Sequence, residues 1–510
     1  MNLNHLLSLL PQRLRENCLV SFKGVSQNSR LGHEMLDIDC SGMTLDSREV
    51  VENDIFLAVN GHQLDGRDYM KSAIDNGASV VIYELHSLSA QQGASVNKAE
   101  CLCIGVTNLN EHASLIASCF YGNPTEEIQV YGITGTNGKT SCCYLLAQAF
   151  NHLGYKTAFM GTIGVGHPDD LELSTHTTLD AVSLQRYLAH LRATGFTHAC
   201  IEVSSHALEQ FRVASVNFYA VLYTNLSQDH LDYHQTMEAY AQAKKRLFVD
   251  FDSTLAIINI NDAFGKAVLA EVNAEFIVSY GNEESGADVV AEDVKATQDG
   301  LAMLMVTESL EFGIESPLLG LVNVPNITLV VSTLLALGVD ASKIESVVRQ
   351  CSAAPGRMEL YDALKLPMVV VDYAHSPDAL KLALLSCRAH CEQQLWVVFG
   401  CGGDRDKEKR PLMGQVAEKH ADRLVVCSDN PRSESPDDII AEILLGIKTC
   451  DRCTVIENRS TAIAYAIKHA SENDLILVAG KGHETGQIIG DHTFPYSDRD
   501  WVKECLEVAA

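Results

Sequence analysis

The segment that most constrains the fold is a glycine-rich turn between an apolar run and a helical pattern. The apolar run, residues 128–133, is typical of a buried strand, and the helical pattern covers residues 142–152. A strand, a glycine-rich turn and a helix in this order direct backbone N–H groups and a helix N-terminus toward a polyphosphate. The predicted nucleotide-binding residues of this turn are Gly135, Thr136, Asn137, Gly138, Lys139, Thr140 and Ser141.

The turn differs from the common P-loop pattern at its first position. That pattern begins with glycine, where this chain has Ile133. The remaining functional positions are present, so we expect Lys139 to contact the phosphates and the Thr140 hydroxyl to hold Mg²⁺. The sequence therefore predicts a compact variant of the phosphate loop.

Composition limits the possible partners and surroundings of the chain. Its 510 residues exceed a single core, and Lys plus Arg total 38 against 66 Asp plus Glu. A net charge of −28 argues against nucleic-acid binding and against an anionic membrane surface. The N-terminus lacks the features of a signal peptide, and the longest apolar stretch, 327–339, is too short to span a membrane. We expect a cytoplasmic protein without membrane insertion.

The 16 cysteines are expected to be reduced thiols in such a protein. A single CxxC pair, Cys450 and Cys453, lacks a second pair at zinc spacing. Structural thiols are the favoured interpretation, and a redox or metal role stays open.

The chain divides into three predicted regions with an α/β pattern. The first, residues 1–121, ends at a Tyr-Gly-Asn-Pro cluster, the second covers 122–353, and the third, 354–510, begins near an Ala-Pro-Gly turn. Helical patterns between apolar runs predict mostly parallel sheets with crossover helices. The predicted strands are 128–134, 199–203, 220–224 and 255–260 in the second region and 369–372, 395–400, 424–428 and 475–479 in the third.

Polar or glycine-rich clusters follow the carboxyl ends of these strands, where open parallel sheets bind ligands. Two of them accompany the phosphate loop: one places Glu202 at a strand end, and the other offers Asp229, His230, Asp232 and His234. His230 and His234 have the spacing of a zinc pair on a helix, but the glutamate that usually follows the first histidine is absent. On the residues alone, structural and metal-binding interpretations both stay open.

Seven of these segments together resemble the Mur ligases, the ATP-dependent amino-acid-adding enzymes of peptidoglycan precursor synthesis. They occur in the family's order, and the resemblance extends from about Thr44 to Trp501. It implies an N-terminal UDP-substrate domain, a central P-loop-type ATPase domain with a mostly parallel sheet, and a C-terminal Rossmann-like amino-acid domain. The segments are 135–140, 202–206, 225–234, 356–359, 372–377, 429–432 and 480–484.

The resemblance also implies a reaction. A carboxylate of UDP-N-acetylmuramoyl-L-alanyl-D-glutamate attacks the γ-phosphate of ATP, and an amine then displaces phosphate from the acyl phosphate. The amine is expected to belong to meso-diaminopimelate, because Arg432 in Asp-Asn-Pro-Arg can bind the extra carboxylate that lysine lacks. On its own, Arg432 could equally be a surface arginine after a proline turn. We expect ATP and Mg²⁺ as cofactors and a monomeric enzyme.

Site residues follow from the same resemblance. Lys139, His230 and Lys244 are assigned to catalysis, and Thr140, Glu202, His230 and Lys244 to Mg²⁺. Lys244 matches a lysine that is carbamylated in similar enzymes, and a carbamate is an anionic metal ligand. Without the resemblance Lys244 would be interpreted as a solvated helix residue, and the adjacent Lys245 would be an equal candidate.

The remaining implied residues contact nucleotide or substrate. The nucleotide-side residues are Asn323, Asn326, Arg357, Asp372, Tyr373 and His375. The UDP-substrate residues are Leu45, Ser47, His62, Gln63, Leu64, His176, Thr177, Thr178, Ser204, Gln210 and Arg212, although the family usually has Asn where His176 stands. The amino-acid residues are Arg405, Asp429, Asn430, Pro431, Arg432, Gly480 and Glu484.

Three alternatives were weighed against this function. A lysine-adding Mur ligase would share the reaction but not need Arg432. A folylpolyglutamate-synthase-like ligase would share fold and chemistry but not the 429–432 segment. A non-enzymatic P-loop switch would need neither the paired metal-site clusters nor a second Rossmann-like domain.

Overall fold

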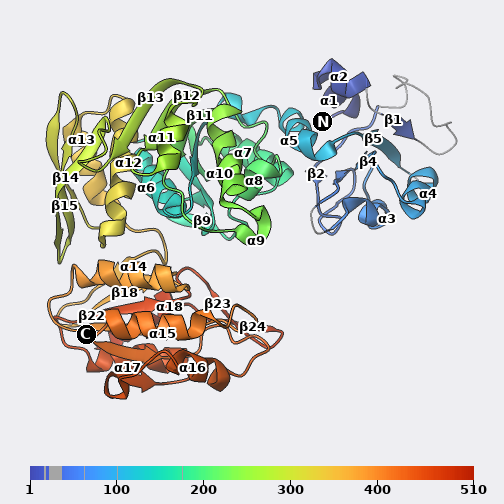
Figure 1. Cartoon of the computed structure of the whole chain (residues 1–510). Helices are drawn as coiled ribbons and strands as arrows, with labels where there is room; N and C mark the ends of the chain where they lie inside the picture. The colour runs from blue at the N-terminus through green and yellow to red at the C-terminus, as the bar shows by residue number, and fades with distance from the viewer. Residues whose placement is uncertain (17–18, 22–36, 62–63, 100, 175, 510) are drawn as a thin grey trace. The chain divides into compact units, whose positions relative to one another are not determined.

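The computed structural model describes the chain except residues 17–18, 22–36, 62–63, 100, 175 and 510 (Figure 1). Its residues form two compact units. Unit 1 contains residues 1–136, 155–256 and 270–276, and unit 2 contains residues 137–154, 257–269 and 277–510. Among the described residues, no helix combines the length and apolarity needed to cross a lipid bilayer.

The N-terminal part of unit 1 is a sheet with strand order β1-β5-β4-β3-β2, in which β1 runs antiparallel and the others run parallel. Successive residues of β3 face opposite cores: Ile55 and Leu57 pack with α1 and α5, whereas Phe56 and Ala58 pack with α3. The strands are β1 (Leu19–Ser21), β2 (Met43–Thr44), β3 (Ile55–Ala58), β4 (Val80–Glu84) and β5 (Leu102–Val106), and the helices are α1 (Leu3–Leu9), α2 (Gln12–Glu16), α3 (Met70–Asp75), α4 (Ala90–Lys98) and α5 (Leu109–Phe120).

The rest of unit 1 contains the sheet that ends in the phosphate loop. Its strand order is β11-β6-β10-β7-β8-β9, parallel from β11 to β7 and antiparallel at β8 and β9. The strands are β6 (Gln129–Thr134), β7 (Thr157–Gly161), β8 (Gly164–His167), β9 (Asp170–Glu172), β10 (His198–Glu202) and β11 (Phe218–Tyr223), with helices α7 (Ala181–Ala193), α8 (Ser205–Glu209), α9 (Leu231–His234) and α10 (Met237–Val249).

Unit 2 begins with the helix that follows the phosphate loop, α6 (Lys139–His152). Strands β14, β15 and β16 form an antiparallel ribbon that was not among the predicted strands. Two of the points in the sequence at which the chain passes from unit 1 to unit 2 lie within strands, namely β12 (Ser253–Asn259) and β13 (Ala274–Gly281). The other elements of this part are α11 (Ala263–Leu269), β14 (Val289–Thr297), β15 (Gly300–Val306), β16 (Glu311–Ser316), α12 (Val324–Ala336) and α13 (Ala341–Gln350).

The C-terminal part of unit 2 is a three-layer α/β/α structure (Figure 1). Its sheet has the order β17-β18-β22-β19-β20-β21, and β17 alone among them runs antiparallel. Helices α14 (Pro377–Arg388), α15 (Lys409–His420) and α16 (Pro436–Leu444) cover one face, and α17 (Arg459–His469) and α18 (Asp498–Ala509) the other. The strands are β17 (Glu359–Tyr361), β18 (Met368–Asp372), β19 (Leu395–Phe399), β20 (Arg423–Val426), β21 (Cys453–Val455) and β22 (Leu475–Ala479), followed by the hairpin β23 (Gly486–Ile489) and β24 (His492–Pro495).

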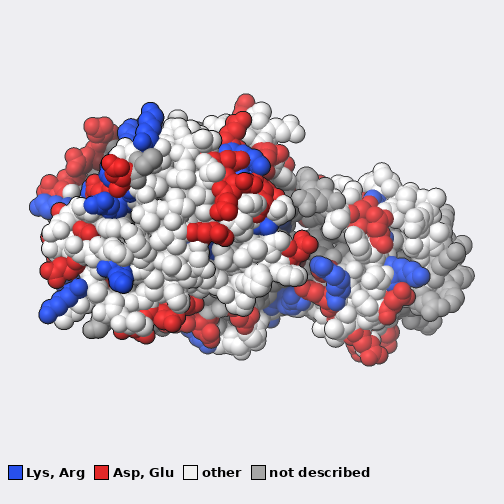
Figure 2. Space-filling model, turned by 90° about the horizontal axis from the view of Figure 1, so that it is seen from below, with Lys and Arg blue, Asp and Glu red and all other residues white. Residues whose placement is uncertain are grey.

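The predicted α/β class with mostly parallel sheets is confirmed. Each of the eight predicted strands is present as β6, β10, β11, β12, β18, β19, β20 or β22, with ends that shift by at most two residues. The acidic excess of the chain is distributed over its surface, and lysine and arginine are interspersed with it on the face in Figure 2.

A buried histidine connects α14 to the β14–β15 ribbon within unit 2. His390 is 3% exposed, and its Nδ1 contacts the carbonyl oxygen of Thr297 at 2.5 Å. Its Nε2 accepts a hydrogen bond from the backbone N–H of Gly320 at 2.7 Å. Since Nε2 accepts, Nδ1 carries the proton and donates to Thr297, which defines a neutral ring. Burial lowers the pKa of His390 below its ordinary value.

This arrangement predicts a loss of stability in mild acid. The pKa of His390 is lower in the folded than in the unfolded chain, so its contribution is present above about pH 6.5 and is lost as the pH falls toward the folded pKa. At pH 8, His390→Gln should lower the urea midpoint, which corresponds to a loss of about 1–3 kcal/mol in the free energy of unfolding. The midpoint of this variant should also change less than that of the wild type between pH 8 and pH 5.5. Exposed His492 supplies the control, His492→Gln; identical pH profiles for wild type and His390→Gln would contradict the prediction.

Candidate active site

The phosphate loop leaves β6 in a backbone conformation that requires glycine. Gly135 has φ +151°, and a Cβ there would collide with the side chain of Thr224. The next residue, Thr136, donates its backbone N–H to the carbonyl of Asn225 at 2.7 Å and its hydroxyl to that of Ser227 at 3.2 Å. The predicted loop is therefore attached to the 225–234 segment within unit 1.

In unit 2, α6 begins at Lys139 after Gly138, whose φ is +82°. Thr140 is buried in the first turn of this helix, and the N-terminus of a helix is a position that favours bound anions. Two predicted nucleotide-side residues lie beside this turn. Asn326 accepts a hydrogen bond from the Cys142 thiol at 3.2 Å and donates its own amide to Asn323 Oδ1 at 2.9 Å.

Glu202 is the centre of a polar cluster in unit 1. Its side chain is fully buried at the end of β10, and its carboxylate accepts from the backbone N–H of Thr162 at 2.8 Å and from the hydroxyl of that residue at 3.2 Å. The Thr162 hydroxyl also contacts Thr177 at 3.1 Å, and the Thr178 hydroxyl donates to the Glu202 carbonyl at 2.7 Å. The 176–178 segment, predicted to contact the UDP-substrate, therefore lies beside the predicted metal ligand Glu202.

Arg212 joins the same cluster. Its Nη1 donates to the Thr178 carbonyl at 2.9 Å, and its Nε and Nη2 hold Gln210 Oε1 at 3.0 and 2.6 Å. The Thr178 hydroxyl also accepts from the Ser204 N–H at 3.0 Å. Burial lowers the pKa of Arg212. His176 is exposed beside Ser174 at the edge of this group.

Lys244 is buried rather than solvated, contrary to the interpretation from the residues alone. It is 1% exposed on α10, and its Nζ donates to the Gly135 carbonyl at 2.7 Å. The ring of Tyr240 lies 4.6 Å from the same nitrogen. Lys245 points elsewhere and pairs with Glu271 at 2.7 Å. Lys244 is therefore the lysine that reaches the phosphate loop.

The imidazole rings of His206, His230 and His234 lie close to one another. The His206 ring lies 5.1 Å from His230 and 5.4 Å from His234, and burial lowers the pKa of His206 to about 4. His234 contacts Ser205 at 2.9 Å and Glu209 at 3.1 Å, which is a structural role. His230 has φ +52° and pairs with Asp229 at 3.5 Å. No set of three or more His, Cys, Asp and Glu side chains in the described part of the chain is arranged to hold a metal.

The predicted uridine-side residues lie in the N-terminal part of unit 1. Ser47 is buried and its carbonyl accepts from the Asn76 amide at 2.8 Å, while Leu45 packs against the core that contains Met43. Leu64 is 66% exposed, and its carbonyl accepts a hydrogen bond from the backbone N–H of Gly61 at 3.0 Å. His62 and Gln63 lie outside the described residues.

A second nucleotide-side group surrounds Tyr373 in unit 2. The guanidinium of Arg357 lies 4.7 Å from the Tyr373 ring, and the rings of His375 and His483 lie 4.7 and 4.9 Å from it. Within the described structure, Arg357 Nε and His483 Nδ1 are buried without a hydrogen-bond partner. Burial lowers the pKa of His483 to about 4. Buried polar atoms of this kind are positions at which a bound molecule can supply hydrogen-bond partners.

Asp372 fixes the loop that carries Arg357. Its two carboxylate oxygens accept from the backbone N–H groups of Met358 at 2.8 Å and Ala374 at 2.9 Å. Burial raises the pKa of Asp372. Asp372 therefore holds the backbone of the loop that carries Arg357.

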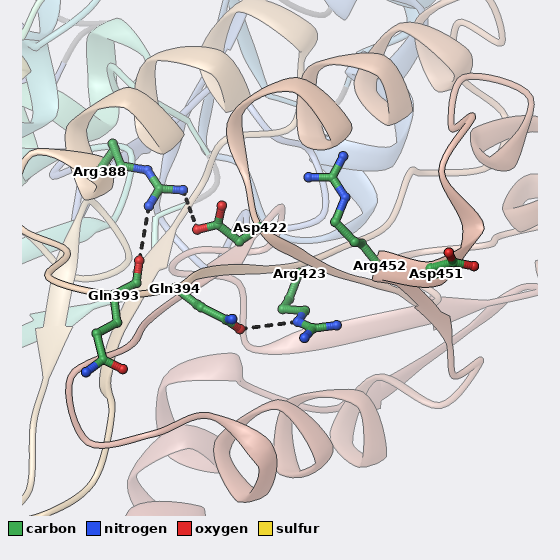
Figure 3. Close-up of a pocket in the computed structure, with 7 residues that line it drawn as sticks. All are labelled: Arg388, Gln393, Gln394, Asp422, Arg423, Asp451 and Arg452. Atoms are coloured by element: carbon green, nitrogen blue, oxygen red, sulfur yellow. Dashed lines mark hydrogen bonds and ion pairs between the residues drawn. The ribbon is translucent and has the colours of Figure 1, made fainter.

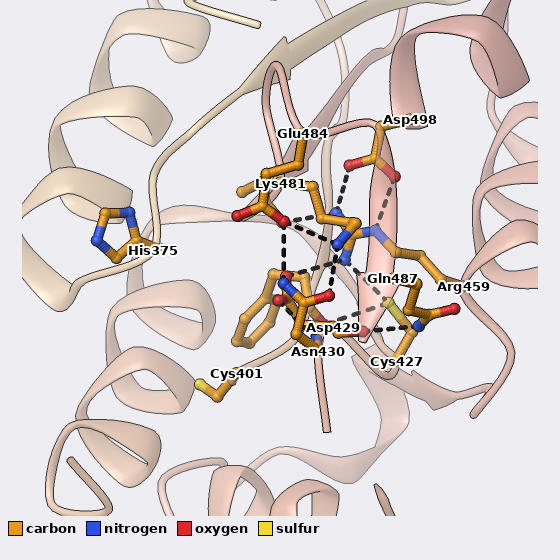
Figure 4. A network of polar contacts seen from close by, with 12 residues as sticks. His375, Cys401, Cys427, Asp429, Asn430, Arg459, Lys481, Glu484, Gln487 and Asp498 are labelled. Carbon is orange, nitrogen blue, oxygen red and sulfur yellow. Dashed lines mark hydrogen bonds and ion pairs between the residues drawn. The ribbon is translucent and has the colours of Figure 1, made fainter. Parts of the chain in front are cut away.

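The predicted amino-acid residues follow the carboxyl ends of strands in the C-terminal sheet, and three of them, Asp429, Asn430 and Glu484, lie together in Figure 4. Arg432 has φ +51° and donates from Nη1 to the Gly403 carbonyl at 2.7 Å. The Asn430 amide donates to Glu484 Oε2 at 2.9 Å, and the Gln487 amide donates to the Asp429 carbonyl at 2.6 Å. Arg405 is exposed on the neighbouring loop.

A buried ion pair between Arg459 and Asp498 lies next to the carboxyl edge of this sheet. Arg459 Nε and Nη2 donate to the two oxygens of Asp498 at 2.7 and 2.6 Å, and both side chains are almost fully inaccessible to solvent. Arg459 Nη2 also donates to the Ala479 carbonyl at 2.9 Å, and its Nη1 lies 3.8 Å from Asp429. The pair therefore holds the two chain segments that carry Asp429 and Gly480.

A cavity of about 420 Å³ lies at the opposite, amino edge of the same sheet (Figure 3). Two of its three arginines pair with neighbouring side chains: Arg388 pairs with Asp422 at 2.6 Å, and Arg423 donates to Gln394 at 3.2 Å. It includes none of the predicted site residues.

Five residues in these groups are not among the predicted site residues: Thr162, Lys481, His483, Arg459 and Asp498. Lys481 and His483 stand inside the recognised segment 480–484, and a lysine between two glycines after a buried strand is a usable signal. Thr162, Arg459 and Asp498 carry no local signal, because they reach the site through tertiary contacts alone.

Comparison with known proteins agrees with the motif order. Models of the Mur ligase family catalytic domain, the Mur ligase middle domain and the Mur ligase glutamate ligase domain match residues 39–121, 133–334 and 356–482. The chain is 41% identical over 488 residues to a UDP-N-acetylmuramoyl-L-alanyl-D-glutamate–2,6-diaminopimelate ligase of Haemophilus influenzae, covering 92% of this chain and 97% of that protein.

Solved structures give the same result. A structure of a UDP-N-acetylmuramoyl-L-alanyl-D-glutamate–2,6-diaminopimelate ligase is 34% identical with a TM-score of 0.69, covering 96% of this chain and 99% of that one. A Mycobacterium tuberculosis folylpolyglutamate synthase, solved with ADP and AMPPCP, is 18% identical with a TM-score of 0.57 over 73% of this chain and 92% of that one. The second likeness concerns the fold alone.

The buried ion pair predicts a large stability cost when one partner is removed. Asp498→Asn leaves the Arg459 guanidinium buried without its counter-charge, so the free energy of unfolding should fall by about 3–5 kcal/mol. Glu315→Gln removes a surface partner of Arg349 and should change it by less than about 1 kcal/mol. Urea denaturation of both variants checks this, and equal midpoints would refute it.

Proposed function

Since this chain belongs to the Mur ligase family, we propose that it is the ATP-dependent ligase that joins meso-diaminopimelate to the D-glutamate of UDP-N-acetylmuramoyl-L-alanyl-D-glutamate. Arg432 carries the choice of amino acid. It lies at the edge where Asn430 and Glu484 meet, so one group of side chains offers a guanidinium to a carboxylate and a carboxylate to an ammonium. That combination matches the zwitterionic far end of diaminopimelate.

The first step activates the acceptor. A carboxylate oxygen of the D-glutamate attacks the γ-phosphorus of ATP, and the bond to the ADP oxygen breaks, which gives an acyl phosphate and ADP. We assign the phosphates to the backbone N–H groups and side chains of Gly135, Thr136, Asn137, Gly138, Lys139, Thr140 and Ser141. Asn323, Asn326, Arg357, Asp372 and His375 are assigned to the rest of the nucleotide. The unpartnered Arg357 Nε supports a ligand at that group.

Two anions approach each other in this step, so charge neutralisation is its main requirement. Mg²⁺ would be held by Thr140, Glu202, His230 and a carbamate on Lys244, and it would supply positive charge to the phosphate oxygens. The oxygen donors of this set suit Mg²⁺, although His230 is less typical of it. The Lys244 ammonium cannot ligate a cation, but its carbamate could, and the carbamate nitrogen keeps one N–H for Gly135.

In the second step the amine nitrogen attacks the acyl carbon, the C–N bond forms, and the amine loses a proton as phosphate leaves. Arg432 and Glu484 would orient the amino acid through its far carboxylate and ammonium, with Arg405, Asp429, Asn430, Pro431 and Gly480 completing the pocket. Holding the amine in line with the acyl carbon lowers the entropic part of the barrier.

The UDP-substrate is assigned to Leu45, Ser47, His62, Gln63 and Leu64 and to the cluster of His176, Thr177, Thr178, Ser204, Gln210 and Arg212. Contacts of Arg212 with Thr178 and Gln210 support the second group. We further propose domains at 1–121, 122–353 and 354–510, and a monomeric, cytoplasmic enzyme that acts in peptidoglycan precursor synthesis.

The amino acid is tested by competition. With ATP, Mg²⁺ and the UDP-dipeptide acceptor, kcat/KM for meso-diaminopimelate should exceed that for L-lysine by about 10⁴-fold, because bound lysine would cover the half-buried Arg432 guanidinium without giving it a carboxylate partner. Arg432→Met should lower kcat/KM for diaminopimelate by about 10²–10³-fold and reduce the discrimination. Arg423→Met, at the opposite edge, is the control. Equal efficiency with L-lysine favours the lysine-adding alternative, and phosphate release with a folate acceptor favours the folylpolyglutamate one.

Carbamylation of Lys244 is tested by chemical rescue. Lys244→Ala should lose about 10²–10³-fold in kcat, and acetate or formate should restore part of it by supplying the missing carboxylate. Lys245→Ala alters the adjacent lysine, which pairs with Glu271, and should change little. Failure of every short carboxylate to restore activity in a folded Lys244→Ala protein would count against the modification.

A further inference from the structure

Lys481 is a buried cation inside the amino-acid pocket that has no assigned role above. Its side chain is 0% exposed, and its Nζ donates to Asn430 Oδ1 at 2.8 Å and to Glu484 Oε2 at 2.9 Å. The Asn430 amide donates to the same Glu484 oxygen at 2.9 Å. The three side chains therefore form a closed triangle, which Figure 4 shows at the centre of the network.

The triangle fixes the orientation of both pocket residues. Glu484 Oε2 accepts from Lys481 and Asn430, so the carboxylate is anchored through one oxygen while its side chain remains 32% exposed. Asn430 Oδ1 accepts from Lys481 and from the backbone N–H of Ile488 at 3.0 Å. Acceptance by Oδ1 requires the amide nitrogen to face Glu484, so the Asn430 side chain is held in one orientation.

The same contacts extend to Arg432. The backbone N–H of Arg432 donates to the Ile488 carbonyl at 3.1 Å, and its carbonyl accepts from Gly490 at 2.7 Å. Ile488 in turn donates to Asn430, which Lys481 holds. Lys481 is thereby connected to every charged group proposed to bind the far end of the amino acid.

We propose that Lys481 is a positioning residue that sets Glu484 and Asn430 for the zwitterionic end of the amino-acid substrate; this rests on the proposed function. Its charge has a second effect. A cation 2.9 Å from Glu484 weakens the attraction of that carboxylate for a lone ammonium, so a substrate gains full binding by presenting its carboxylate to Arg432 as well. Lys481 thus favours a zwitterion over a simple cationic side chain.

The test is Lys481→Met, which keeps most of the unbranched side chain and removes its charge and donors. KM for meso-diaminopimelate should rise about 10- to 100-fold, with KM for ATP and for the UDP-dipeptide within about twofold of wild type. The kcat/KM ratio of diaminopimelate to L-lysine should fall. A rise in all three KM values together, or an unchanged diaminopimelate KM, would overturn the proposal.

A double-mutant cycle separates positioning from general damage. If Lys481 acts through Glu484, adding Lys481→Met to Glu484→Gln should raise the diaminopimelate KM by less than about threefold more, whereas independent effects would multiply. Lys481→Gln retains a donor and should recover part of the loss, and it replaces Lys481→Met if that variant does not fold. Arg388→Met removes a cation–carboxylate pair at the opposite edge and is the matched control.

Failure of the proposed function and failure of the inference about Lys481 give different results. If the wild-type enzyme prefers another amino acid, the proposed function fails whatever the variants do. If it prefers diaminopimelate and Lys481→Met leaves that KM unchanged, the inference about Lys481 fails alone.

Discussion

The Arg459 guanidinium and the Asp498 carboxylate are removed from water together, and the amino-acid pocket is built on that pair. Desolvating two charges is costly, and the cost is offset only by close bidentate geometry and by further hydrogen bonds. Arg459 has both, because it also holds the Ala479 carbonyl and lies near Asp429. The strand end at Gly480 and the loop at 429–432 are therefore held by the same buried cation. The pocket side chains that these two segments carry are positioned by it as well.

Local charge arrangement explains how so acidic a chain handles anions. With a net charge of −28, the surface as a whole does not attract anions. Each anionic group must therefore be bound by a local anion-binding group. The start of α6 is one such anion-binding group. The guanidiniums of Arg212 and Arg432 are two others, and each guanidinium donates to a neighbouring carbonyl oxygen. Binding is thereby confined to a few groups with defined geometry.

Much of this could be predicted from the sequence, for identifiable reasons. Buried parallel strands are continuous apolar runs, so β6, β10, β18 and β22 stand out, and the ligand residues follow their carboxyl ends. The β14–β16 ribbon has one solvated face, so its apolar residues alternate with polar ones and its signal is weaker. The burial of Lys244 depends on where α10 packs, which no local pattern records.

Other features are beyond local sequence for the same reason. The role of His390 depends on two backbone groups, at Thr297 and Gly320, that are far away along the chain. The ion pair of Arg459 with Asp498 joins residues on two helices, and neither position is distinctive alone. The motif order supplied what these contacts could not, because it aligned Arg432 and Lys244 with a known chemistry.

The unpartnered atoms beside Tyr373 carry a thermodynamic consequence. Arg357 Nε and His483 Nδ1 are already shielded from solvent, so their dehydration is complete before any ligand arrives. A ligand that pairs with them gains hydrogen bonds without having to strip water from those two atoms, so the desolvation cost of binding is smaller. The unliganded protein should accordingly be less stable than its contacts suggest, and saturation with ligand should recover the difference as a rise in the melting temperature.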